Sequence, residues 1–133
     1  MTELFLADTS ALVRFFRRQS DPDWDDSVAA GLVGICEPVR QEYLRAAGAR
    51  SAYYEADSLL RETFPYYVVR DGVWDETADL QHRLAEKSWH QSASPVHLLV
   101  AVTATHHELT VLHDDADFET IARLTGQPVR RIG

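Results

Sequence analysis

Cysteine and long hydrophobic runs are both scarce in this chain of 133 residues. The single cysteine, Cys36, cannot form a disulfide within the chain, which excludes a disulfide-stapled secreted scaffold, and we expect it to be buried in a strand. The longest apolar stretch, 98–105, is too short to span a bilayer. The first residues lack the basic region and apolar core of a signal peptide, because Glu3 and Asp8 precede any basic side chain. We therefore expect a cytoplasmic protein without membrane association.

Basic residues are also few relative to acidic ones. The chain has 13 lysines and arginines against 21 aspartates and glutamates, a formal net charge of −8, and Lys87 is its only lysine. This sign repels phosphate backbones and argues against a protein that coats nucleic acids. It does not exclude a nuclease whose acids surround metal ions. None of the 6 glycines forms a Walker-type phosphate loop, which argues against phosphate chemistry of that kind.

Length and patterning predict one α/β domain over residues 1–133 with a mainly parallel central sheet. A hydrophobic content of 45% is typical of folded proteins. Apolar or β-branched runs alternate with segments of helical spacing, as in parallel sheets. The expected strands are 4–7, 34–36, 66–70, 109–113 and 128–132, and the expected helices are 11–18, 25–32, 38–47, 52–64, 73–89, 95–107 and 118–124.

Acidic side chains follow two of the predicted strands. Asp8 ends the first, and Asp114, Asp115 and Asp117 follow the strand at 109–113. Carboxyl ends of parallel strands share one edge of a sheet, and Glu42, on the helix after the second strand, lies within reach of it. Clustered carboxylates repel one another unless a hard divalent cation neutralises them, so we expect Mg²⁺ or Mn²⁺ here.

Four segments carry a resemblance to a known family: 6–12, 38–44, 95–101 and 110–118. In this order and spacing, with Asp-Thr-Ser-Ala-Leu at 8–12 and Asp-Asp-Ala-Asp-Phe at 114–118, the chain resembles the PIN domain, in particular VapC-like toxins of bacterial toxin–antitoxin systems. The resemblance implies a three-layer α/β/α fold and a Mg²⁺-dependent endoribonuclease that cleaves tRNA, rRNA or mRNA. It also implies a homodimer and a VapB-like antitoxin that inserts a basic side chain into the acidic pocket. It assigns catalytic roles to Asp8, Glu42 and Asp115, and metal ligation to Asp8, Asp115 and Asp117.

His97 departs from the family pattern, which usually has an aspartate at this position. It falls in the first turn of its helix, where the positive end of the helix dipole favours a neutral over a charged imidazole. Neutral imidazole can ligate Mn²⁺ but suits Mg²⁺ poorly. Three outcomes are open: weaker metal binding rescued by Asp114 or Asp117, an altered metal preference with His97 as a ligand, or lost catalysis with binding retained. We favour reduced or metal-shifted nuclease activity.

Several candidate residues also have structural interpretations. Asp8 and the acids at 114–117 can cap the helices that follow them. Arg14, Arg17 and Arg18 have helical spacing, so this face either holds RNA phosphates or pairs with the acids at 21–26. His106 and His107 suit the carboxyl end of their helix. Trp24, Trp74, Trp89 and the pair Tyr53–Tyr54 belong either to the core or to a contact with a partner.

Two further functions remain open. The first is a catalytically weakened PIN domain that acts as a regulatory or binding module, for which His97 is the supporting feature. The second is an unrelated α/β phosphohydrolase that uses Mg²⁺ on a small phosphate ester; the absence of a glycine-rich phosphate loop argues against it.

Overall fold

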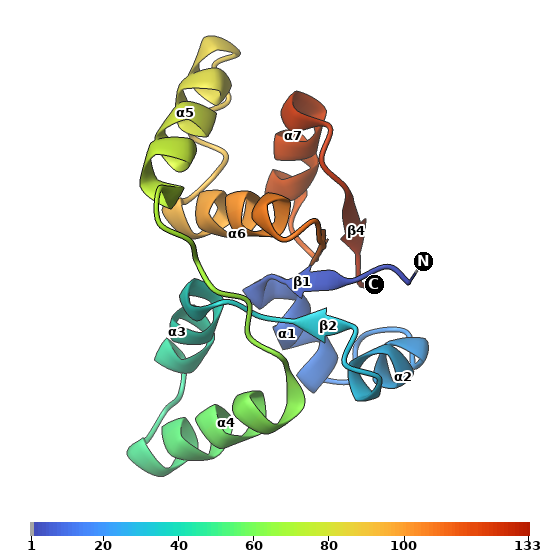
Figure 1. Ribbon diagram of the computed structural model, residues 1–133. Coiled ribbons are helices and arrows are strands. Elements are labelled where there is room, and N and C mark those ends of the chain that lie inside the picture. Colours follow the sequence, from blue (N-terminus) through green and yellow to red (C-terminus); the bar gives the residue numbers. More distant parts are fainter. Residues whose placement is uncertain (1) are drawn as a thin grey trace.

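The described chain, residues 2–133 of a computed structural model, is built around a parallel four-stranded sheet with the strand order β2-β1-β3-β4. Seven helices connect or follow the strands (Figure 1). The elements in chain order are β1 (Phe5–Ala7), α1 (Thr9–Phe16), α2 (Asp23–Ala29), β2 (Val33–Gly34), α3 (Glu37–Arg45), α4 (Arg50–Thr63), α5 (Val73–Glu86), α6 (Pro95–His106), β3 (Thr110–His113), α7 (Ala116–Thr125) and β4 (Val129–Arg131).

Helices cover both faces of the sheet. Figure 1 shows α5, α6 and α7 above the strands and α1, α2 and α4 below them. Every residue of β1 and β3 is buried, which explains why β1 and the centre of β3 are apolar without the alternation of a half-exposed strand. Helix α6 is apolar on nearly all sides because it lies between the sheet and the outer helices. The predicted three-layer α/β/α architecture is confirmed.

The predicted strand at 66–70 is wrong. Tyr66 forms only an isolated bridge with Ile35, and the rest of this segment is irregular. The carbonyl of Val68 accepts a hydrogen bond from the His107 ring instead of a neighbouring strand, and Val68 is 66% exposed. High β-propensity produces a strand only where a sheet edge and a buried face are both available.

Two boundary differences affect the site. Helix α1 begins at Thr9 and ends at Phe16, so Arg18 lies beyond it with φ 57°. Helix α7 begins at Ala116, two residues earlier than predicted, because the Asp115 side chain caps it.

Cys36 is buried, as predicted, but it precedes α3 and lies just beyond β2. No helix within residues 2–133 combines the length and apolar character needed to cross a membrane.

Candidate active site

Asp8 sits at the carboxyl end of β1 and is only 2% exposed. Its Oδ2 caps α1 by accepting hydrogen bonds from the Ser10 backbone N–H at 3.1 Å and the Ser10 hydroxyl at 2.7 Å. Its Oδ1 is buried and has no hydrogen-bond partner among residues 2–133. Burial raises the pKa of Asp8, and the Ser10 hydrogen bonds oppose that rise only in part. Asp8 is therefore a helix cap with one carboxylate oxygen still unused.

Ser10 joins the two acidic segments that are distant in sequence. Its hydroxyl donates to Asp8 and accepts the Asp114 backbone N–H at 2.9 Å. The strands support the same junction, since β1 pairs with β3 through Ala7 and Leu112, and the Asp8 N–H donates to the Leu112 carbonyl at 2.9 Å. The carboxyl ends of β1 and β3 thus meet at one edge, as the sequence predicts. Ser10 itself lies within the motif at 8–12, but its linking role depends on the pairing of two strands.

A tight cluster of three side chains forms next to this junction. One ligand atom each from His97, Asp115 and Asp117 lies within 4.8 Å of the other two. His97 Nε2 is 3.1 Å from Asp115 Oδ2, and His97 Nδ1 is 3.5 Å from Asp117 Oδ2. Asp115 also caps α7 by accepting the Asp117 backbone N–H at 2.9 Å. Partial burial and the Asp115 charge raise the pKa of Asp117.

Asp8 and Glu42 lie beside this cluster and outside its tight grouping. The His97 and Glu42 side chains are close enough for their charges to influence the pKa of Asp8, His97 lowering it and Glu42 raising it. Glu42 makes no ion pair or side-chain hydrogen bond within residues 2–133, and it borders two hollows, of about 400 and 540 Å³, on either side of α3. The structure therefore brings the predicted acids Asp8, Glu42, Asp115 and Asp117 to one region, with His97 among them.

His97 occupies the first turn of α6, as predicted, and takes part in a capping box. Its backbone N–H donates to the Ser94 hydroxyl at 3.2 Å, and its Nδ1 accepts the Ser94 backbone N–H at 3.2 Å. In a typical capping box a glutamate or glutamine performs the second task. The sequence indicated Ser94 as the cap, but that the imidazole returns the contact is visible only in the structure.

His113 is a supporting residue that sequence reasoning missed. It ends β3, is fully buried, and its Nδ1 accepts the Asp115 backbone N–H at 3.2 Å. Its Nε2 is buried with no hydrogen-bond partner among residues 2–133, and burial lowers the pKa of His113. The Phe118 ring packs against both imidazoles, with centroids 5.1 Å from His97 and 5.5 Å from His113. In the sequence, the only indication of this supporting role is the position of His113 directly before the acidic segment 114–117.

The three arginines proposed for RNA contact do not act together. Arg18, beyond the end of α1, pairs with Asp25 at 3.3 Å, which is the ion-pair alternative. Arg14 lies 3.7 Å from Asp114, which also pairs with Arg131 at 3.3 Å. Arg17 makes no ion pair within residues 2–133. Because two arginines neutralise Asp114, it is less suited than Asp117 to compensate for His97.

The donor set fits a hard divalent cation. Aspartate oxygens are ligands that Mg²⁺ and Mn²⁺ accept, and Asp8 lies beside Asp115 and Asp117, with no lysine or arginine paired to any of the three in the described residues. The buried, unpartnered Oδ1 of Asp8 is the strongest single indication, because a buried carboxylate oxygen without a partner is costly. Such a site can bind a cation and hold a phosphate next to it.

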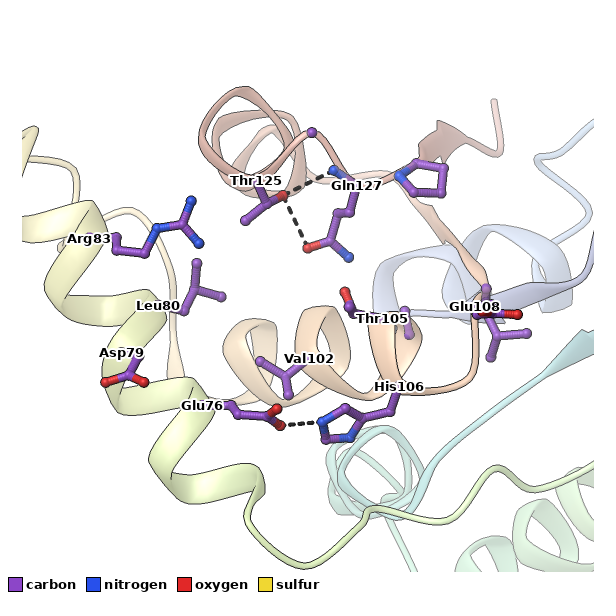
Figure 2. Close-up of a pocket in the computed structure, with 14 residues that line it drawn as sticks. Glu76, Asp79, Leu80, Arg83, Val102, Thr105, His106, Glu108, Thr125 and Gln127 are labelled. Atoms are coloured by element: carbon purple, nitrogen blue, oxygen red, sulfur yellow. Dashed lines mark hydrogen bonds and ion pairs between the residues drawn. The ribbon is translucent and has the colours of Figure 1, made fainter.

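A larger hollow lies elsewhere, between α5, α6 and the turn from α7 to β4. It measures about 630 Å³ and is lined by none of the predicted acids. Figure 2 shows Glu76 facing His106, and the Thr125 hydroxyl hydrogen-bonded to the Gln127 side chain. The Gln127 amide also donates a hydrogen bond to the Ala101 carbonyl at 3.0 Å. These contacts link α5 to α6, and α6 to the turn after α7. We therefore assign the site to the carboxyl edge of the sheet.

Comparison with known proteins agrees with this assignment. The PIN domain family model matches residues 5–124. Ribonuclease VapC21 of Mycobacterium tuberculosis is 31% identical over 97% of this chain and 94% of that protein, and Ribonuclease VapC6 of the same species is 38% identical over 75% of this chain and 80% of that protein. The DNA-bound VapBC structure from Salmonella typhimurium aligns with a TM-score of 0.78 at 14% identity, over 99% of this chain and 100% of that one. The chain therefore belongs to the PIN domain family and is VapC-like within it.

Proposed function

We propose that this protein is an endoribonuclease toxin of a VapBC-type toxin–antitoxin system. The observation that carries the proposal is the position of Asp8 beside Asp115 and Asp117 at one sheet edge, with a buried Asp8 oxygen that has no partner among residues 2–133. Relatives that are named VapC ribonucleases and cover most of the chain support the substrate class. RNA phosphodiester bonds are the expected target.

Mg²⁺ or Mn²⁺ is the proposed cofactor. Asp8, Asp115 and Asp117 would hold the cation, and Glu42 would add negative charge beside it. When bound, such an ion positions a water nucleophile and stabilises charge on the phosphate. Ser10 keeps the Asp8 carboxylate in place, and the two helix caps at Asp8 and Asp115 fix both carboxylates before any ligand arrives. Among the three arginines at 14–18, Arg17 makes no ion pair within residues 2–133 and borders the hollow of about 400 Å³ beside Glu42, so it is the best remaining candidate for a phosphate contact.

Three partners complete the proposal: the RNA substrate, a VapB-like antitoxin and a second copy of the chain. Solved structures with this fold include VapBC complexes, which supports the antitoxin. An arginine from it would match the carboxylate cluster in charge and geometry. Trp74 is 68% exposed and Val68 is 66% exposed, so an aromatic and an aliphatic side chain are available for a protein contact. Trp24, in contrast, is buried in the core.

Replacing Asp8 tests the proposed activity. Asp8→Asn keeps an oxygen that can cap α1 but removes the charge at the unpartnered position. We expect RNA cleavage in Mg²⁺ or Mn²⁺ to fall about a hundredfold or more, equivalent to roughly 2.7 kcal/mol of transition-state stabilisation, and growth arrest on induced expression to disappear. Asp26→Asn, an exposed aspartate in α2, is the matched control and should behave like the natural protein. Harmless expression together with no cleavage in either metal would contradict the toxin proposal.

A binding module is the second candidate, and the fixed orientation of His97 is the observation that favours it. An imidazole in place of a fourth acid reduces the negative charge available to a cation. A protein that binds a VapB-like antitoxin tightly but cuts no RNA in Mg²⁺ or Mn²⁺ would support this candidate. Cleavage that depends on Asp8 would reject it.

A further inference from the structure

Both ring nitrogens of His97 are already engaged in the structure. Nδ1 accepts the backbone N–H of Ser94 at 3.2 Å, which requires a lone pair on Nδ1. In a neutral ring the proton then resides on Nε2, and Nε2 lies 3.1 Å from Asp115 Oδ2. The ring is thus an acceptor toward the helix cap, and its Nε2 faces the Asp115 carboxylate at ion-pair distance. Contact with Phe118 at 5.1 Å between centroids restricts the ring plane.

Metal ligation by His97 is incompatible with these contacts. A ligating nitrogen needs a free lone pair, but the lone pair of Nδ1 faces the Ser94 N–H and Nε2 carries the proton. The opposite tautomer would free Nε2 but place an N–H on Nδ1 against the Ser94 N–H, with Asp117 Oδ2 at 3.5 Å as its only compensation. Breaking the cap would also release a backbone N–H at the start of α6.

We propose, on the basis of the function proposed above, that His97 is a positioning residue for Asp115 and not a metal ligand. Its Nε2 lies 3.1 Å from Asp115 Oδ2 and restrains that side of the carboxylate, while Asp115 Oδ1 accepts the Asp117 N–H at 2.9 Å. The carboxylate is therefore contacted at both oxygens, and each oxygen keeps a lone pair for a cation. His113 holds the Asp115 backbone from the other side, through the N–H bond to its Nδ1.

Nitrogen NMR of the metal-free protein tests the tautomer directly. Long-range ¹H–¹⁵N spectra distinguish a proton on Nε2 from one on Nδ1, and loss of one set of signals in His97→Gln assigns the ring. We expect the Nε2–H pattern for His97. A proton on Nδ1 would overturn the proposal, and His82→Gln, an exposed histidine on α5, controls for the assignment.

Electron spin-echo spectroscopy with bound Mn²⁺ tests ligation. We expect no ¹⁴N coupling from a directly bonded imidazole in the natural protein. A coupling that disappears in His97→Gln would overturn the proposal. If Mn²⁺ binds to no form of the protein, the proposed metal-dependent function fails, whereas the NMR result still decides the tautomer of His97.

Two substitutions separate positioning from mere packing. A glutamine amide carries an acceptor and a donor on one carbon, as the imidazole does, so His97→Gln can keep both contacts, and glutamine is favoured at this capping-box position. Methionine has similar length but keeps neither contact. We expect His97→Met to weaken Mn²⁺ binding, measured by calorimetry, about 10- to 100-fold, and His97→Gln to restore most of that loss. Equal losses in both variants would contradict a role that depends on the donor.

Discussion

Individual carboxylates at the site perform two tasks at once. Asp8 caps α1 with Oδ2 and keeps Oδ1 unpartnered within the described residues, and Asp115 caps α7 while facing His97. Capping fixes a side chain that would otherwise rotate, so each acid is in place before a ligand binds. The sequence left open whether these acids cap or ligate. The geometry makes the two roles compatible in the same residue.

Glu42 provides a prediction at the residue scale. Glu42→Gln removes charge next to Asp8 without removing an ion pair within residues 2–133, so we expect the free energy of unfolding to change little. RNA cleavage at limiting Mg²⁺ should fall about tenfold, close to 1.4 kcal/mol, and recover in part at high Mg²⁺. Glu55→Gln on α4 is the control, since Glu55 is exposed. Full activity of Glu42→Gln at limiting Mg²⁺ would show that Glu42 does not contribute to the metal site.

The connection after α4 explains why the high β-propensity of residues 66–70 led to a wrong prediction of a strand. The chain at 65–67 crosses β2 closely, and a Cβ on Gly34 would lie 2.3 Å from the Tyr67 ring and 2.8 Å from the Pro65 carbonyl. Because glycine has no Cβ, the chain can pass this close to β2. Its Pro65 carbonyl and Tyr67 N–H form hydrogen bonds with the Ile35 backbone, and the chain then leaves the sheet. Tyrosine and valine at these positions have a high propensity for strands, but within residues 2–133 no further strand lies beyond them to pair with.

Helices α3 and α4 are fastened by an ion pair that gives a prediction about pH. Arg40 Nε lies 2.9 Å from Asp57 Oδ1, and Arg61 also contacts that oxygen at 3.3 Å. The hydrogen bond from Arg40 lowers the pKa of Asp57 below its ordinary value of 3.8. A carboxyl with a depressed pKa in the folded state adds stability above its unfolded pKa and loses it as the pH falls through the folded pKa.

We therefore expect Asp57→Asn to lower the free energy of unfolding at neutral pH and to approach the natural protein as the pH falls below about 4. Urea unfolding at a series of pH values measures the difference. Glu62→Gln on the same helix is the control, because Glu62 is exposed. A difference that stays constant down to about pH 2 would show that the charge of Asp57 is not responsible.

The charges of the whole molecule fall into separate groups despite the net −8. Asp8, Glu42, Asp115 and Asp117 gather at the sheet edge, whereas the acids of α2 lie in another segment, where Arg18 pairs with Asp25. A cation would neutralise part of the first group in use. The sign of the net charge is thus weak grounds against RNA cleavage, because local arrangement decides which charges a phosphate meets.

Binding of a cation at this edge should stabilise the whole fold. A ligand at a hundred times its Kd adds about 2.7 kcal/mol to the free energy of unfolding, so Mg²⁺ or Mn²⁺ should raise Tm by several degrees and a chelator should reverse the shift. Asp8→Asn and Asp115→Asn should reduce the shift, while Asp26→Asn should not. Equal shifts in all variants, measured by scanning calorimetry, would place the cation elsewhere.

The sequence alone determined the alternation of helices and strands, the parallel sheet and the acids at strand ends. These follow from local periodicity and from the rule that parallel strands end at one edge. Only the tertiary structure decided that Ser10 links two strands, that His113 supports Asp115, and that the segment at 66–70 is not a strand. The physical reason is that hydrogen-bond partners and sheet edges are shared between segments far apart in the chain. His97 illustrates both sides: its sequence position placed it in a first helical turn, but the contacts to Ser94 and Asp115 fix what each nitrogen can do.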